Sequence, residues 1–148
     1  MKIYLLILSL FFSLSFSQDE GYIWPTDASK TVTAFFGEMR PNRYHTGIDI
    51  RTFGINGKEI YAIEDGYVYR IGISNHKYGN VLYLKLKDEN IAVYSHLDRF
   101  NPIIQKAASQ IQDQENSYSI DYFLEPGLIN VNKGDIIGYT GDTGGLSG

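Results

Sequence analysis

Hydrophobic and polar residues alternate most clearly between residues 81 and 97 of this 148-residue chain. From Val81 to Lys87 a leucine stands at every second position, and the run from Ile91 to Leu97 continues the alternation after a polar turn. Successive side chains of a strand point to opposite faces, so the pattern predicts two antiparallel strands with one well-buried face. In the second strand this alternation places His96 on the same face as Tyr94.

Shorter runs of β-branched and aromatic residues predict further strands. These runs cover residues 32–36, 59–63, 67–73, 118–124, 129–131 and 135–139. Asp65-Gly66 is a hairpin signal between two of the runs, and Lys133-Gly134 predicts a turn between the last two. Residues 74–80 form a polar loop, in which we expect His76 at the surface.

Residues 101–116 depart from the strand pattern and favour a helix. Apolar residues at helical spacing form one stripe: Ile103, Ile104, Ala107, Ala108 and Ile111. The opposite face is polar and rich in glutamine, as is typical of a helix that packs on one side only. Asn101 is a suitable N-cap and Pro102 a suitable first helical residue. We therefore predict a mainly β domain with one inserted helix near residues 102–115.

The first seventeen residues have the pattern of a secretion signal. A short basic segment, Met1-Lys2, precedes an apolar run over residues 3–16. That run is shorter than the roughly 18–20 residues that span a bilayer. Small residues at positions 15 and 17 predict cleavage after Ser17, although an uncleaved anchor is the alternative. We expect an exported protein of the periplasm, cell envelope or extracellular space, with no stable membrane span after cleavage.

Composition and charge narrow the function classes. The chain has 13 basic and 17 acidic residues, a formal charge of -4, and no cysteine. Loss of residues 1–17 removes Lys2 and leaves a charge of about -5, a poor match to nucleic acid, which binds Lys and Arg. The absence of cysteine excludes disulfides, thiol catalysis, cysteine-ligated zinc and a lipid-modified N-terminal cysteine.

Candidate chemistry lies in two segments that contain His45, Asp49 and His96. One histidine, one aspartate and a distant histidine are typical of a catalytic zinc site assembled from separate parts of a chain. A straight strand holds residues four apart at about 13 Å, so we expect the chain to bend, with Gly47 permitting the bend. The residues alone leave two other readings open. His45 can be a loop histidine with Asp49 capping a turn, and His96 can be a buried, hydrogen-bonded core residue.

The order of motifs along the chain resembles the lysostaphin-type (LytM-like) zinc metalloendopeptidase family of peptidoglycan hydrolases. The matching motifs are Phe36-Gly37, His45-Thr46-Gly47-Ile48-Asp49-Ile50, Ile60-Tyr61-Ala62, Asp65-Gly66-Tyr67-Val68, Tyr78-Gly79-Asn80, Tyr94-Ser95-His96-Leu97 and residues 131–141. The resemblance covers roughly residues 24–148, apart from an insertion at about 100–130. It implies an antiparallel sheet or barrel-sandwich of the duplicated hybrid motif type, in a peptidase domain over residues 18–148.

The resemblance implies a role for each matching residue. His45 and Asp49 correspond to two ligands of a Zn²⁺ cofactor, and His96 to a catalytic histidine beside the metal. The family's third ligand is the second histidine of a Pro-His-x-His segment, which we expect beyond Gly148. The 148-residue chain taken alone is therefore expected to be inactive, and the full-length form to hydrolyse peptide bonds of peptidoglycan stem peptides or cross-bridges.

Two other functions are compatible with parts of the pattern. The first is a non-catalytic relative of the same fold that binds peptidoglycan or activates another hydrolase, with a cell-envelope protein as a possible partner. The second is a biotinyl- or lipoyl-type carrier module, suggested by residues 65–68 and 133–138. No lysine of this chain stands in the tight hairpin setting that such a carrier modifies, and a secretion signal does not suit it.

Overall fold

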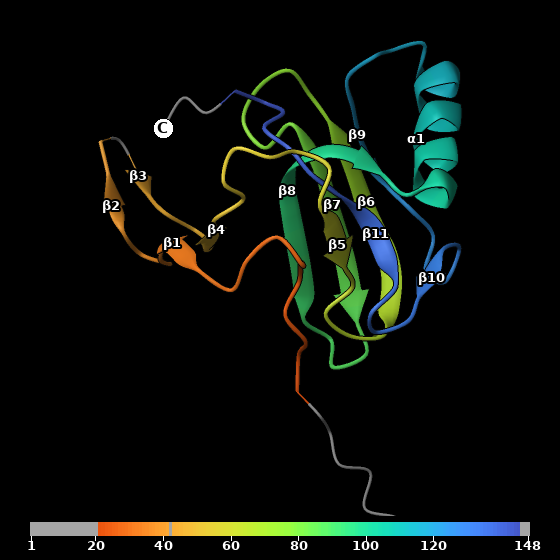
Figure 1. Cartoon of the computed structure of the whole chain (residues 1–148). Helices are drawn as coiled ribbons and strands as arrows, with labels where there is room; N and C mark the ends of the chain where they lie inside the picture. Colours follow the sequence, from red (N-terminus) through yellow and green to blue (C-terminus); the bar gives the residue numbers. More distant parts are fainter. Residues whose placement is uncertain (1–20, 42, 146–148) are drawn as a thin grey trace, which may run out of the picture.

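The computed structural model describes residues 21–41 and 43–145, and the predicted signal segment lies outside these residues. The described strands all pair antiparallel, in a mainly β architecture with one helix, as expected. The main sheet contains β5 (Glu59–Tyr61), β6 (Gly66–Ile73), β7 (Asn80–Leu86), β8 (Ile91–Phe100), β9 (Ile120–Phe123), β10 (Asn130–Val131) and β11 (Ile136–Thr140). Its order is β10-β6-β7-β8-β11-β5, and β9 also pairs with β6 (Figure 1).

Two small sheets lie in the segment 31–56, which we term the N-terminal arm. β1 (Val32–Ala34) pairs with β4 (Asp49–Ile50), and β2 (Met39–Arg40) pairs with β3 (Arg43–Tyr44). In Figure 1 the arm extends to one side of the main sheet, and the helix stands on the other side. The candidate ligands His45 and Asp49 both belong to this arm.

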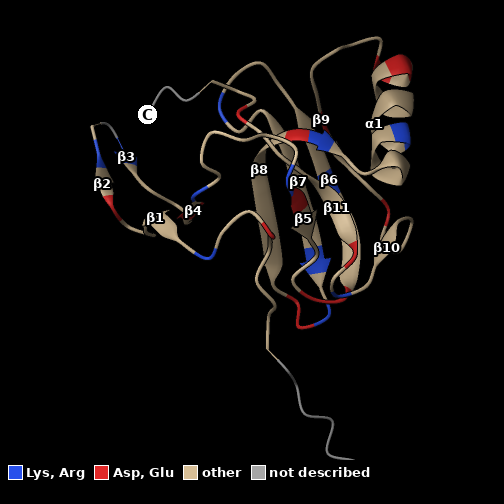
Figure 2. Cartoon of the chain, viewed as in Figure 1, with Lys and Arg blue, Asp and Glu red and all other residues tan. Residues whose placement is uncertain are grey.

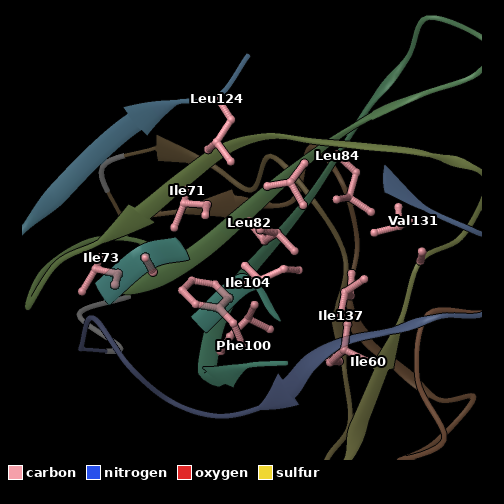
Figure 3. Packing of buried hydrophobic residues seen from close by; sticks show 14 of the residues in the cluster. Ile60, Ile71, Ile73, Leu82, Leu84, Phe100, Ile104, Leu124, Val131 and Ile137 are labelled. Carbon is pink, nitrogen blue, oxygen red and sulfur yellow. The ribbon is translucent and has the colours of Figure 1, made fainter. Parts of the chain in front are cut away.

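The core forms where the alternating strands and the helix face each other. Leu82 and Leu84 of β7 are fully buried, as their alternation predicts, and the cluster around them appears in Figure 3. The helix α1 (Pro102–Glu115) begins as predicted: the Asn101 side chain accepts a hydrogen bond from the Ile104 amide at 2.8 Å. Ile104 contributes to the core, whereas Ile103 of the predicted stripe is 68% exposed.

One expectation about strand pairing is wrong. Asp65-Gly66 does not close a hairpin, because β5 pairs with β11 while β6 pairs with β7 and β9. The Asp65 carboxylate instead accepts a hydrogen bond from the Lys133 amide at 2.8 Å, which holds this turn against the later turn at 132–135. That later turn forms as predicted, with Gly134 at φ +90°, but the strands on its two sides join different neighbours.

The predicted insertion at 100–130 supplies α1 and β9, and both become part of the main body. Ala108 and Ile111 of α1 are buried, and β9 pairs with residues Arg70–Ile73 of β6. Basic and acidic residues are interspersed along the described chain (Figure 2). Within the described part, no helix is long and apolar enough to cross a membrane.

Candidate metal and catalytic site

His45 and Asp49 converge in the N-terminal arm. His45 directly follows β3 and Asp49 begins β4, with 3.2 Å between His45 Nε2 and Asp49 Oδ1. The chain therefore bends between them, as expected. Gly47 is not the reason, however: its φ is not positive, and a Cβ atom there would meet nothing within 4 Å.

The donor atoms of this pair suit a shared cation. His45 Nδ1 lies 3.0 Å from the Phe35 carbonyl oxygen, so this nitrogen carries the proton and Nε2 of a neutral ring carries the lone pair. A lone pair facing a carboxylate oxygen is unfavourable unless a proton or a metal ion lies between them. Two ligand atoms at about 2.0–2.2 Å from a tetrahedral zinc are about 3.3 Å apart. The observed separation of 3.2 Å fits zinc bound by both residues.

Arg40 holds the other oxygen of the Asp49 carboxylate. Its Nη2 atom lies 2.5 Å from Asp49 Oδ2, and it reaches Asp49 from β2, across the arm. Side chains that hydrogen-bond to metal ligands orient them and commonly affect metal affinity. Sequence analysis did not identify Arg40, although a basic residue shortly before a predicted ligand pair was a visible signal.

A β-bulge in β8 determines where His96 lies. Leu82 pairs with Tyr94 and Asn80 with Leu97, so two residues of β7 span three of β8. The extra residue shifts the alternation, and Leu97 enters the core with only 1% of its surface exposed. His96, at φ +60°, is thereby removed from the face that it was predicted to share with Tyr94. The reading of His96 as a buried core residue is wrong, because its side chain is half-buried beside a loop.

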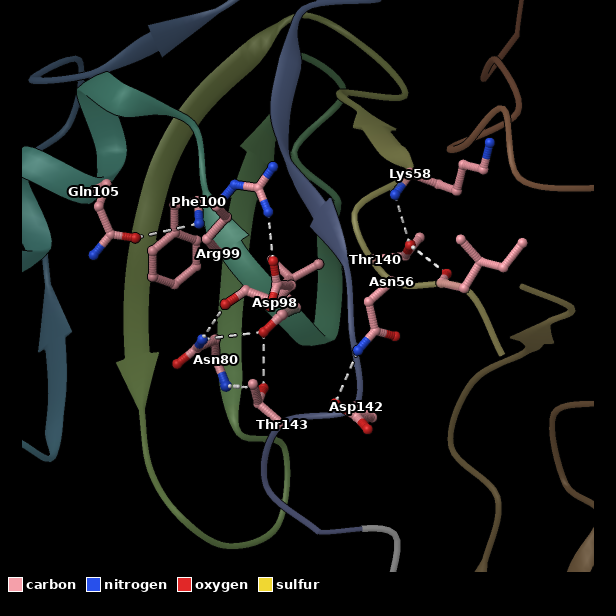
Figure 4. Close-up of polar contacts among 12 residues, drawn as sticks. Asn56, Lys58, Asn80, Asp98, Arg99, Phe100, Gln105, Thr140, Asp142 and Thr143 are labelled. Carbon is pink, nitrogen blue, oxygen red and sulfur yellow. Dashed lines mark hydrogen bonds and ion pairs between the residues drawn. The ribbon is translucent and has the colours of Figure 1, made fainter. Parts of the chain in front are cut away.

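The glycine-rich turn at 141–145 orients the His96 ring. His96 Nδ1 lies 2.9 Å from the Thr143 carbonyl oxygen, which leaves Nε2 as the unprotonated nitrogen of a neutral ring. Thr143 Oγ1 in turn donates to the Leu97 carbonyl and accepts from the Asn80 amide (Figure 4). The approach is so close that a Cβ atom on Gly79 would lie 2.3 Å from the Thr143 backbone. Glycine is thus required for this turn to reach His96.

The described contacts do not join the two parts of the predicted site. His45 contacts Phe35 and Asp49, whereas His96 contacts Tyr78 and Thr143. Within residues 21–41 and 43–145, no group of three His, Asp or Glu side chains is arranged to hold a metal. The structure therefore presents a candidate pair of ligands, His45 and Asp49, and a separately oriented histidine, His96.

The family comparison covers both parts. Residues 43–115, which include His45, Asp49 and His96, match the model for peptidase family M23. The chain is also 36% identical over 75 residues to the murein hydrolase activator NlpD of Salmonella dublin, and equally to that of Salmonella typhimurium strain LT2. The match covers 51% of this chain and 18% of each relative. The chain belongs to the lysostaphin-type (LytM-like) family, within peptidase family M23.

Proposed function

We propose that this protein is a zinc-dependent endopeptidase that hydrolyses peptide bonds in peptidoglycan stem peptides or cross-bridges. The observation that carries the proposal is the His45–Asp49 pair, whose facing donor atoms are 3.2 Å apart. Membership of peptidase family M23 supports the assignment as a hydrolase. The name of the NlpD relatives supports a function that involves murein. A third protein ligand is proposed to come from outside the described residues, and export to the cell envelope would bring the protein to this substrate.

His45 and Asp49 would bind the zinc, and His96 would act beside it as a general acid or base. Zinc at such a site polarises the scissile carbonyl and activates water for attack. His96 donates through Nδ1 to the Thr143 carbonyl, so its Nε2 is the nitrogen available to the substrate. As a general base this nitrogen would accept a proton from the attacking water, and once protonated it would donate one to the developing oxyanion.

The alternative is a non-catalytic protein that binds peptidoglycan or activates another hydrolase in the envelope. The observation in its favour is the name of the relatives, which are called murein hydrolase activators. Retention of His45, Asp49 and His96 favours the peptidase, because an activator needs neither a metal ligand pair nor an oriented histidine.

The test measures zinc content and peptidoglycan hydrolysis of the full-length protein in parallel. The peptidase predicts about one zinc per chain and release of new amino groups from purified peptidoglycan. Asp49→Asn and His45→Gln should lose both zinc and activity, whereas His96→Ala should keep zinc and lose activity. A protein that binds no zinc and releases no amino groups, yet stimulates a separate hydrolase, is the activator.

A further inference from the structure

A pocket of about 450 Å³ opens on the side of the main sheet near β9. Its walls are β6, β7, the loop 74–79 and the start of β9, and they include Arg70, Lys77, Tyr83 and Asp121. Neither His45 nor Asp49 lines it. This volume lies within the range of about 300–1,000 Å³ that small ligands and peptide ends occupy.

One wall of the pocket lies outside the segment that matches the family model. Ser119, Ile120 and Asp121 line it and lie beyond residue 115, where the match to the M23 family model ends. They are held in place because β9 pairs with β6, Ile120 opposite Ile73 and Asp121 opposite Gly72. The inserted segment thus builds a wall that the matched family segment does not contain.

The charges of two pocket residues cancel each other. Arg70 binds the Asp121 carboxylate with two contacts, Nε to Oδ1 at 2.5 Å and Nη2 to Oδ2 at 2.6 Å. This guanidinium holds the pKa of Asp121 below its usual range, so the carboxylate stays ionised and paired. Arg70 also lies over the Tyr83 ring, with its Cζ atom 4.7 Å from the ring centroid. Its guanidinium group therefore already contacts both Asp121 and Tyr83.

Lys77 is the cation that remains. Within the described residues its ammonium group makes no hydrogen bond or ion pair, and the neighbouring His76 side chain makes none either. Both line the pocket, where the one carboxylate among the lining residues is already paired with Arg70. The pocket therefore carries local positive charge on a protein whose formal net charge is -4.

The loop that carries Lys77 also supports His96. The Tyr78 carbonyl accepts a hydrogen bond from the His96 amide at 2.8 Å. Gly79 packs directly on the Thr143 backbone, which holds the His96 ring. One side of this loop thus borders the candidate catalytic histidine, and the other side borders the pocket.

We infer that this pocket binds the terminal carboxylate of a peptide through Lys77, with the rings of Tyr78 and Tyr83 against its last side chains. The inference rests on the proposed function, because it assigns the pocket to a peptide that His96 acts on. It predicts a preference for peptides whose free carboxyl end lies within a few residues of the cleaved bond. Aromatic walls and one placed charge are a typical composition for such a site.

The test compares acetylated trialanine with a free carboxyl end and the same peptide with an amide end. Isothermal titration calorimetry on the full-length protein should show about fivefold tighter binding of the acid, as expected for one exposed charge contact. Lys77→Gln should abolish the difference, and Lys77→Glu should reverse it. The control Lys106→Gln, on the exposed side of α1, should leave it unchanged. Equal binding of acid and amide, or a difference that survives Lys77→Gln, overturns the inference.

The same variants separate this inference from the proposed function. Lys77→Gln should keep the zinc content of the native protein, because Lys77 contacts neither His45 nor Asp49. A protein that hydrolyses peptidoglycan but binds acid and amide equally has the proposed function without this pocket's role. A protein that prefers the acid but contains no zinc has the pocket without the peptidase.

Discussion

The main sheet and the N-terminal arm differ in how they are held together. In the sheet, Leu82 and Ile71 are fully buried, and most strands pair over four or more residues. In the arm, the strands are two or three residues long, and large apolar side chains such as Phe36 and Met39 are about three-quarters exposed. The sheet therefore gains its shape from burial, whereas the arm depends on hydrogen bonds and the Arg40–Asp49 ion pair.

This difference separates the parts of the candidate site. His96 lies on the sheet, where a bulge and the turn at 141–145 orient it from two sides. His45 and Asp49 lie on the arm, where few buried contacts resist movement. A metal bound between them would add the cross-link that the arm's own packing does not provide.

The strongest test of the comparison is a pair of apolar deletions. Ile71→Ala removes a fully buried side chain of the sheet and should lower the free energy of unfolding by about 2–5 kcal/mol. Phe36→Ala removes a larger side chain of the arm and should cost less than about 0.5 kcal/mol. Urea denaturation measures both, with exposed Ile103→Ala as the control. Similar losses for Ile71 and Phe36 would show that the arm is packed as firmly as the sheet.

The next largest effect concerns the turn that orients His96. Gly79 and Gly54 both have a positive φ, +61° and +69°, so alanine is strained at either position, by roughly 1 kcal/mol. Only at Gly79 would the new Cβ atom also meet the Thr143 backbone. Gly79→Ala should therefore cost about 2–3 kcal/mol and release the His96 ring, visible as a shift of its ring nitrogens by NMR. If Gly54→Ala on the arm perturbs the His96 ring equally, the turn is not the element that holds it.

A smaller effect is expected from the residue that orients Asp49. Arg40→Gln removes the ion pair to Asp49 and should weaken zinc binding by the full-length protein about tenfold. Arg43 stands opposite Arg40 in the β2–β3 pair and makes no ion pair within the described residues, so Arg43→Gln is the matched control. Competition with a chromophoric chelator gives both affinities. Equal loss in the two variants would indicate a general effect of charge rather than orientation of Asp49.

The smallest expected effect is on the pH dependence of the stability of the main sheet. Glu64 is buried, and the Asp65 amide lowers the pKa of its carboxylate, as do the ammonium groups of Lys87 and Lys133. A lowered pKa adds stability above the ordinary value of 4.5, and this stability is lost as pH falls through the folded-state value. Thermal unfolding between pH 3 and pH 7 should therefore depend less on pH in Glu64→Gln than in the native protein. The exposed Glu115→Gln should retain the native profile.

Sequence patterns predicted the sheet far better than the arm. Alternation gave β7 within one residue, and Asn101 marked the start of α1, because both signals arise from neighbouring residues. Strand partners were less accessible: Asp65-Gly66 suggested a hairpin, but the pairing of β5 with β11 depends on residues about 75 positions away. The bulge at His96 was invisible for the same reason, since it becomes apparent only when β8 is aligned with β7.

The candidate ligands were predicted as residues, but their surroundings were not. A histidine and a carboxylate four positions apart can be read from the chain, and the structure brings His45 and Asp49 together. The Phe35 carbonyl and the Arg40 guanidinium that orient them come from elsewhere in the arm: Phe35 follows β1, and Arg40 lies in β2. Their roles depend on how short strands fold back, which local patterns do not specify.

The turn that holds His96 also has a consequence for the order of folding. Thr143 lies 63 positions from Asn80 and 47 from His96, whereas β7 and β8 are joined by a short connection. Contacts between distant residues require closure of a long loop, so they form later than local hairpins. During refolding, amides of the β7–β8 hairpin should become protected from hydrogen exchange before the His96 ring is oriented. The hairpin is a local unit that can form early, while the geometry of the candidate catalytic histidine arises only when the distant turn docks.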